Sequence, residues 1–341
     1  MPTISDIAKV SGVSTATVSY VLNNRKGAVS AETRERVLGV MRELNYRPSP
    51  LIMRKHAAKA NALGVTFMHP NMTSLTDHPW ITLLLDGILS VTTPIHWDLV
   101  LLTANSTANF HQVLRNKCDG RCDGLVLLGM STQPELVDVL KERGLPFVCV
   151  NMGNNMEGVT CVDVDNETAA REAINLLLKL GHRRIGLLAG DAKSENSISR
   201  EVGYRSALCE AGLTPEPMFA PPGVFTEMSG HERALRLLSM PAGTRPTAFF
   251  CASDRIAFGA IKAAGELGLK VPDDVSVIGF DDVPKAAECE PPLTTVRQPL
   301  LDLGRRAAEL LLGEINEMAR PGQKDILATR LILRETTGPA R

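Results

Sequence analysis

From residue 61 onward, the chain alternates short runs of β-branched and other apolar residues with longer stretches of helical periodicity. This alternation predicts βαβ units, in which parallel strands are buried between layers of helices. The predicted strands are 63–67, 98–102, 124–128, 147–150, 185–189, 248–251 and 275–280. The predicted helices are 81–91, 134–143, 166–180, 200–211, 228–238 and 255–267. Because a body of about 280 residues exceeds one sheet of ordinary size, we expect two lobes.

Charge is divided unevenly between this body and the first 60 residues. The 341 residues carry a net charge of −1. Residues 1–60 hold ten Lys and Arg against four Asp and Glu, a net charge of +6, which leaves −7 for the rest. A small basic head on a large acidic body indicates that the head meets nucleic acid or another anionic surface.

Residues 3–45 are predicted to form three short helices. Thr3 can cap the first helix, with Asp6 completing a capping box. Ser14 and Ser30 are the predicted N-caps of the second and third helices. The apolar positions of the second and third helices close a small core with the first, and they are Val18, Val21, Leu22, Val37, Met41 and Leu44.

Two short helices joined by a tight turn that contains glycine are typical of a helix-turn-helix DNA-binding head. In this plan the second helix enters the major groove, where Thr15, Ala16 and Tyr20 face outward and can read base edges. Neighbouring amides, hydroxyls and basic side chains would contact phosphates and fix the register. The expected DNA contacts of the head are Thr3, Lys9, Ser14, Thr15, Ala16, Thr17, Ser19, Tyr20, Asn23 and Arg25. The alternative is a helical hairpin that only docks on the body.

Residues 47–60 form a basic hinge between head and body. Ser49 as N-cap and Pro50 at the first helical position predict a helix of about ten residues, which is marginal on its own in water. We therefore expect the hinge to be disordered without DNA and to fold when two copies meet on an operator. Its expected DNA contacts are Leu51, Arg54 and Lys55. The alternative is a flexible linker, and hydrogen exchange of residues 48–59 with and without operator distinguishes the two.

Polar residues follow several predicted strands of the body, where parallel sheets bind their ligands. Asn151 follows one strand, Ser253 and Asp254 follow another, and Asp281 and Asp282 follow a third. Converging acids and amides suit a small ligand rich in hydroxyl groups. Structural roles are the alternative, because Asp254 can cap the next helix and the Asp281–Asp282 pair can order a loop.

The sequence favours neither an enzyme nor a metalloprotein. It contains no G-x-x-x-x-G-K-[ST], G-x-G-x-x-G, G-x-S-x-G or H-E-x-x-H motif. Cys118 and Cys122 lie four residues apart without a second pair at ligand spacing, so we expect no metal and no cofactor. His182 is predicted to mark the end of a helix and the start of a strand. Seven scattered cysteines and the absence of a secretion signal or membrane span predict a cytoplasmic protein without a membrane partner.

Residues 4–23 read ISDIAKVSGVSTATVSYVLN and resemble the DNA-reading head of the lac/gal repressor family of bacterial transcription regulators. Tyr20 departs from the usual pattern, since that family more often has Arg there. The other stretches that resemble this family are 29–37, 44–48, 180–185, 200–204, 249–260, 271–282 and 292–296. The resemblance therefore covers the chain nearly to its C-terminus.

The resemblance implies a small all-α helix-turn-helix head and an α/β body. The body would have the two-lobed fold of periplasmic sugar-binding proteins, with parallel doubly wound sheets joined by three crossovers. The expected domains are a head at 1–46, a hinge at 47–60 and an effector-binding and dimerisation body at 61–341. Within the body, the N lobe would comprise about 61–162 and 294–326, and the C lobe about 163–293 and 327–341.

By the same likeness, Arg200 would donate to ligand hydroxyls, Asp281 would accept from them, and Phe225 would stack on the ligand. Ser253 stands where Asn is usual in the family, and Asn151 stands where Asp is common. The expected effector-binding residues are Met68, Asn151, Arg200, Phe225, Ser253, Asp254 and Asp281.

We thus expect a DNA-binding regulator, usually a repressor, that acts as a homodimer on double-stranded DNA with a pseudo-palindromic operator. A sugar-like or nucleoside-like metabolite in the cleft between the lobes would control it. The alternative is a stand-alone ligand-binding module whose head no longer recognises an operator.

Overall fold

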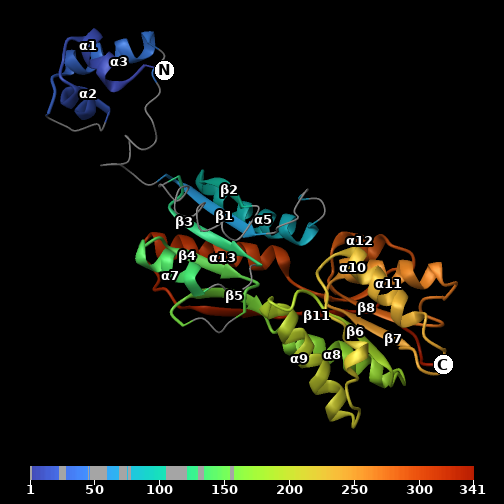
Figure 1. Ribbon diagram of the computed structural model, residues 1–341. Coiled ribbons are helices and arrows are strands. Elements are labelled where there is room, and N and C mark those ends of the chain that lie inside the picture. Colours follow the sequence, from blue (N-terminus) through green and yellow to red (C-terminus); the bar gives the residue numbers. More distant parts are fainter. Residues whose placement is uncertain are drawn as a thin grey trace.

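A computed structural model of the chain describes residues 2–22, 28–44, 46, 60–68, 75, 78–104, 121–129, 134–153 and 157–341 (Figure 1). None of the described helices is long and apolar enough to span a lipid bilayer. The head contains α1 (Ile4–Ser11), α2 (Thr15–Leu22) and α3 (Ala31–Glu43). The body contains two sheets with helices on both faces, which confirms the predicted α/β architecture.

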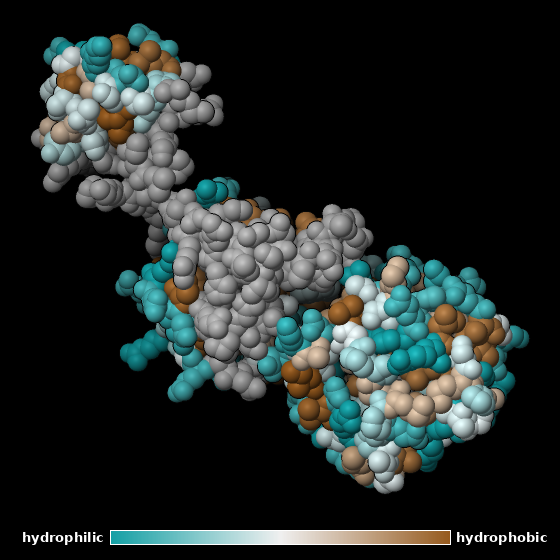
Figure 2. Space-filling view, viewed as in Figure 1, coloured by the Kyte–Doolittle hydropathy of each residue, from teal (hydrophilic) through white to brown (hydrophobic). Residues whose placement is uncertain are grey.

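The head is held together by its caps and a small apolar core. The Thr3 hydroxyl accepts from the Asp6 amide, and the Asp6 carboxylate accepts from the Thr3 amide, so the predicted capping box is confirmed. The Ser14 and Ser30 hydroxyls accept from the Thr17 and Thr33 amides at 3.1 and 3.2 Å, as predicted. The buried residues of the head core are Ile7, Ala8, Val18, Val21, Val37 and Val40. This core leaves the outer face of α2 exposed. Hydrophilic and hydrophobic residues lie side by side on the visible surface of the head (Figure 2).

The N lobe is built on a six-stranded parallel sheet in the order β10-β5-β4-β3-β1-β2. Its strands are β1 (Ala62–Met68), β2 (Asp98–Ala104), β3 (Gly124–Leu128), β4 (Phe147–Val150), β5 (Thr160–Val164) and β10 (Lys324–Leu327). Helices α5 (Pro79–Thr92) and α13 (Leu300–Ile315) cover one face, with the short η1 (Thr93–Ile95) following α5. Helix α7 (Pro134–Glu142) packs on the opposite face.

The C lobe is built on a five-stranded sheet in the order β11-β9-β8-β7-β6. Its strands are β6 (Ile185–Leu188), β7 (Ala248–Cys251), β8 (Ser276–Asp281), β9 (Thr294–Arg297) and β11 (Arg330–Ile332), of which β11 is antiparallel to β9. Helices α8 (Asn166–Lys179) and α9 (Glu195–Glu210) cover one face, and α10 (Glu227–Leu238) and α11 (Asp254–Glu266) cover the other. The short η2 (Pro217–Phe219) and α12 (Pro284–Glu288) lie in connections.

The described body passes between the lobes three times, after β5, β9 and β10. The second crossing differs from the expected boundary at residue 294. Strand β9 pairs with β8 and β11, so Thr294–Arg297 belongs to the C lobe and the chain crosses at Gln298 and Pro299. All three crossings end at the edge where parallel strands terminate, which places a cleft between the lobes.

Glycine allows α10 and α11 to pack with their backbones in contact. A Cβ atom at Gly259 would overlap the Glu227 carbonyl, and one at Gly230 would overlap the Ile256 carbonyl. We expect Gly259→Ala to lower the free energy of unfolding by about 1–3 kcal/mol, because the helices must separate. Urea unfolding of the full chain measures this.

The matched control lies on the same helix. Gly265 is in α11 with no heavy atom near the position of a Cβ atom. Gly265→Ala should therefore stabilise the chain slightly, by up to about 1 kcal/mol, through helix propensity alone. Equal effects of the two substitutions would contradict the close packing of α10 on α11.

Candidate functional site

A cavity lies between the lobes at the ends of their strands. The N lobe contributes His78, Trp80, Gly129 and Asn151 to its lining. The remaining lining residues are Ser194, Asn196, Arg200, Phe225, Ser253, Arg255, Asp281 and Gln298. Its mixture of aromatic and polar groups is typical of sites for small ligands. A molecule bound here would touch both lobes at once.

Arg200 is the most firmly held cation of the cavity. It projects from α9, and its side chain is almost fully buried. Its Nε donates to Asn166 Oδ1 at 2.8 Å and its Nη1 to the Ala252 carbonyl at 2.5 Å. The guanidinium lies 3.6 Å from the centroid of the Phe280 ring, a cation–π distance. Burial lowers its pKa, and the nearby carboxylate of Asp281 opposes this shift, so Arg200 remains a fixed donor.

Asp281 faces the cavity from the end of β8. Its Oδ1 accepts from Gln298 Nε2 at 2.7 Å. Burial raises the pKa of Asp281 to about 6, while the charge of Arg200 lowers it. Above pH 6 the group is therefore mainly a carboxylate that can accept hydrogen bonds. Its backbone has a φ of 121°, and Asn151 at the end of β4 has a φ of 54°; such strain is common at binding sites.

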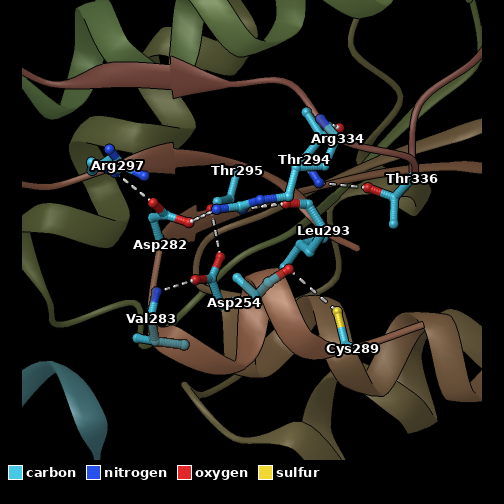
Figure 3. Close-up of polar contacts among 11 residues, drawn as sticks. Asp254, Asp282, Val283, Cys289, Leu293, Thr294, Thr295, Arg297, Arg334 and Thr336 are labelled. Atoms are coloured by element: carbon cyan, nitrogen blue, oxygen red, sulfur yellow. Dashed lines mark hydrogen bonds and ion pairs between the residues drawn. The ribbon is translucent and has the colours of Figure 1, made fainter. Parts of the chain in front are cut away.

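Asp254 does not line the cavity, although it neighbours Ser253 in sequence. Its carboxylate is fully buried, accepting from Thr295 Oγ1 at 2.5 Å and from the Val283 amide at 2.9 Å (Figure 3). Burial and the neighbouring Asp281 raise its pKa well above the usual range. The helix cap is Ser253, whose hydroxyl accepts from the amide of residue 256. The alternative role of Asp254 as N-cap is thus wrong, and the carboxylate instead connects α11 to strand β9 and to the residue before α12.

Asp282 orders a loop, which was the structural alternative given above for the Asp281–Asp282 pair. It forms ion pairs with Arg297 at 2.5 Å and with Arg334 at 2.7 Å (Figure 3). Arg297 is the last residue of β9, and Arg334 follows β11. The two neighbouring acids therefore separate in function: Asp281 faces the cavity and Asp282 faces the arginines.

The predicted effector residues are partly brought together. Asn151, Arg200, Phe225, Ser253 and Asp281 all line the cavity. The side chain of Met68 lies outside the described residues. Sequence reasoning missed the lining residues His78, Trp80, Gly129, Ser194, Asn196, Arg255 and Gln298. Of these, Gln298 directly follows β9, so the rule that ligands bind beyond strand ends would have found it if that strand had been predicted.

Two of the missed residues bridge the lobes. Arg255 on α11 lies with its Nη1 at 3.3 Å from His78 Nδ1, at the start of α5. Asn196 on α9 donates to the Asn151 carbonyl at 3.0 Å. These contacts connect the lobes across the cavity, so a change at the cavity can alter how the lobes meet.

The second candidate site is the outer face of α2. Thr15, Ala16 and Tyr20 are exposed, as predicted, while Ser19 is half-buried. Arg34 on α3 donates to the Val21 carbonyl at 3.3 Å and ties α3 to the end of α2. Of the other expected DNA contacts, Thr3 and Lys9 are exposed, Ser14 and Thr17 share the cap of α2, and Asn23, Arg25, Leu51, Arg54 and Lys55 lie outside the described residues.

Neither His182 nor Cys122 belongs to a metal-binding group among the described residues. His182 lies between α8 and β6, as predicted, with its ring nitrogens near Thr247 Oγ1, Ser276 Oγ and the Gly338 carbonyl at 2.9–3.1 Å. Burial lowers its pKa. Cys122 is buried, whereas Cys118 lies outside the described residues. No group of three or more His, Cys, Asp or Glu among the described residues is placed to hold a metal ion.

Comparison with known protein families divides the chain into the same two parts. A model described as "Bacterial regulatory proteins, lacI family" matches residues 3–49. A model described as "Periplasmic binding protein-like domain" matches residues 174–337. The helices of the head thus fall within the first match, and the C-lobe side of the cavity falls within the second.

Similar proteins match over nearly the whole chain. The HTH-type transcriptional repressor CytR of Escherichia coli (strain K12) is 35% identical over 340 residues, which is 98% of this chain and 96% of that protein. The HTH-type transcriptional repressor PurR of Pasteurella multocida (strain Pm70) is 31% identical over 338 residues, or 98% of each.

Solved structures agree with these sequences. A complex of the transcriptional regulator CelR with cellobiose is 31% identical, covers 98% of this chain and 100% of that one, and has a TM-score of 0.76. The lac repressor dimer bound to operator and the anti-inducer ONPF is 27% identical, covers 99% of each chain, and has a TM-score of 0.74. The similarity therefore includes the head and both lobes.

Proposed function

The chain belongs to the lacI family of bacterial regulatory proteins and is a transcriptional repressor with a DNA-binding head, and from this premise we propose how it is controlled. It acts in the cytoplasm as a homodimer on a pseudo-palindromic operator, and a small metabolite in the interlobe cavity sets its affinity for DNA. The chain is a regulator and not an enzyme.

The observation that carries this proposal is the cavity lined by both lobes. Because a ligand there contacts Trp80 and Asn151 on one side and Arg200 and Asp281 on the other, its binding energy depends on how the lobes are placed. A ligand that binds one arrangement better shifts the population toward it. The relative position of the lobes is thus the two-state element that links effector and operator.

The chemistry of the cavity supports a neutral ligand rich in hydrogen-bonding groups, either sugar-like or nucleoside-like. Arg200 supplies donors and Asp281 supplies acceptors. Two more acceptors, Asn151 Oδ1 and Gln298 Oε1, are buried without a hydrogen-bond partner in the described chain. Burying a polar atom unpaired is costly, so hydroxyl or N–H groups of a ligand would satisfy them. Trp80 and Phe225 add aromatic surface to the lining, which suits a ring of the ligand.

The exposed face of α2 supports sequence-specific binding in the major groove. One head reads one half-site, so a pseudo-palindromic operator requires two heads related by a twofold axis. The solved lac repressor that resembles this chain is itself a dimer on its operator. The hinge that would connect head and body lies outside the described residues, and its coupled folding stays a prediction.

A ligand screen combined with an operator assay tests the proposal. Sugars and nucleosides are screened for a rise in the melting temperature of the full chain, and operator DNA is selected by the chain from random sequence. A ligand that raises the melting temperature should change operator affinity about 5- to 150-fold, which corresponds to about 1–3 kcal/mol of coupling. Fluorescence anisotropy of labelled operator measures this.

The outcomes separate the alternatives. A ligand that binds without changing operator affinity would favour a stand-alone binding module. Chemical turnover of the ligand would contradict the assignment as a regulator. Binding to random DNA as tight as to the selected operator would contradict sequence-specific recognition.

A further inference from the structure

Phe225, an aromatic residue of the cavity, lies on a loop without helix or strand. The loop runs from η2 to the start of α10 and reads Ala220-Pro221-Pro222-Gly223-Val224-Phe225-Thr226. A loop of this kind has no ladder or helix of its own to fix its shape. What holds the Phe225 ring in the cavity must therefore come from outside the loop.

One side of the Phe225 ring is fixed by backbone. The ring tip packs on Gly190, which follows β6, so closely that a Cβ atom there would overlap Cζ. This contact places the ring against the end of the C-lobe sheet. It stops the ring from moving toward the sheet, but it does not hold the loop down.

Arg233 supplies the missing tie. It lies on α10 and is only 7% exposed. Its Nη1 donates to the Ala189 carbonyl at 2.8 Å and to the Pro221 carbonyl at 3.2 Å, while Nε donates to the Ser229 carbonyl at 2.9 Å. One guanidinium thus joins the residue before Gly190, the loop that carries Phe225, and the helix after it.

The setting of Arg233 is unusual for a purely structural cation. Burial lowers its pKa, and no carboxylate of the described residues opposes this shift. Its Nη2 is buried without a partner in the described chain. Carbonyl oxygens alone therefore solvate the charge, and such a buried group is costly unless its donors are used.

We propose that Arg233 is a positioning residue, which holds the 220–226 loop on the end of β6 and so keeps the Phe225 ring in place as a preformed wall of the cavity. This inference rests on the proposed function, because it assigns the wall to effector binding. If the Phe225 wall is already ordered in the free protein, effector binding does not have to supply the conformational entropy cost of ordering it. Ser229, one turn before Arg233 on α10, assists by accepting from the Val224 amide at 3.3 Å.

The structure offers two ways to release this tie. Arg233→Met removes the donors but keeps a long side chain. Gly223→Ala keeps the charge, since a Cβ atom at Gly223 would overlap the Arg233 guanidinium and push it away. Arg236→Met is the matched control, because Arg236 is exposed on the same helix.

The rate of chymotrypsin cleavage reports on Phe225 itself, because this protease cleaves after aromatic residues and needs the surrounding loop to detach from the folded protein. In the full chain, Arg233→Met and Gly223→Ala should each speed cleavage after Phe225 at least tenfold. Amide hydrogen exchange of residues 220–226 should speed up to the same extent in both variants, while exchange of α8 stays unchanged. In the Arg236→Met control, both the cleavage rate and the exchange of residues 220–226 should equal those of the wild type. Arg233→Lys, which retains one donor group, should fall between.

Neither readout needs an effector, so failure of this inference can be distinguished from failure of the proposed function. Unchanged cleavage after Phe225 in both release variants would overturn the positioning role. Equal acceleration across the C lobe would assign Arg233 to general stability and would also overturn it. For a sugar or nucleoside found by the screen, the release variants should bind at least fivefold more weakly; unchanged affinity with a loosened loop would overturn the link to the effector.

Discussion

Replacing Arg200 with Met is expected to abolish the change in operator affinity that the effector causes. The guanidinium is the fixed donor of the cavity, held by Asn166 and the Ala252 carbonyl. Without it, the buried carboxylate of Asp281 loses its compensating charge, and the pKa of Asp281 rises further. The substitution also leaves Asn166 Oδ1 and the Ala252 carbonyl without this donor, which costs about 1–3 kcal/mol for each buried group left unpaired, so the free energy of unfolding should fall as well. Operator anisotropy with a ligand from the screen measures the first effect, and urea unfolding of the full chain measures the second.

Two further variants separate binding from folding. Arg200→Lys keeps the charge but cannot donate to Asn166 and Ala252 in the same planar fork, so effector affinity should fall while folding is largely kept. Arg205→Met on the same helix breaks only the exposed pair with Glu201, and should cost less than about 1 kcal/mol. A full effector response in Arg200→Met would remove Arg200 from the cavity's chemistry.

The sequence predicts those helix caps and strands whose formation depends on residues close together in the sequence. Caps at Thr3, Ser14 and Ser30 are set by residues three positions apart, and all were confirmed. The central strands are buried apolar runs, and the seven predicted ones appear within two residues of their observed bounds. Both signals depend on neighbours in sequence and not on the tertiary fold.

Four strands escaped prediction, β5, β9, β10 and β11, and the polar ones among them obtain their structure from partners. β9 reads Thr-Thr-Val-Arg and β10 reads Lys-Asp-Ile-Leu, neither of which is an apolar run. β9 is a strand because β8 and β11 flank it, and this pairing also moves the lobe crossing from residue 294 to 298. A polar segment of four residues carries too little local information to indicate such a partner.

The site shows the same division. Asn151, Ser253 and Asp281 were found because they follow predicted strands. His78 and Arg255 could not be found that way, since they begin helices in different lobes and meet only when the lobes do. Either Ser253 or Asp254 could cap α11, and the sequence does not distinguish between two adjacent residues. In the structure the Ser253 hydroxyl accepts from a free amide of α11, and the Asp254 carboxylate accepts from the Val283 amide instead.

Placing an acid on the outer face of α2 should abolish operator binding. Ala16 is exposed near the start of α2 and outside the head core, so Ala16→Glu should leave the head folded. In the major groove the new carboxylate would face phosphates and base edges, where opposing like charges costs several kcal/mol. Operator affinity should fall at least about 100-fold, as measured by anisotropy with the selected operator, while effector binding to the body is retained.

Leu38→Glu is the control of equal charge, because Leu38 is exposed on α3 and not on α2. It lowers the net charge of residues 1–60 from +6 by the same unit, so it should weaken binding only through the general attraction to phosphates. That attraction makes wild-type affinity fall steeply with salt, since the head is basic and the body is acidic. If Ala16→Glu and Leu38→Glu weaken binding equally, or if affinity is independent of salt, α2 is not the element that reads the operator.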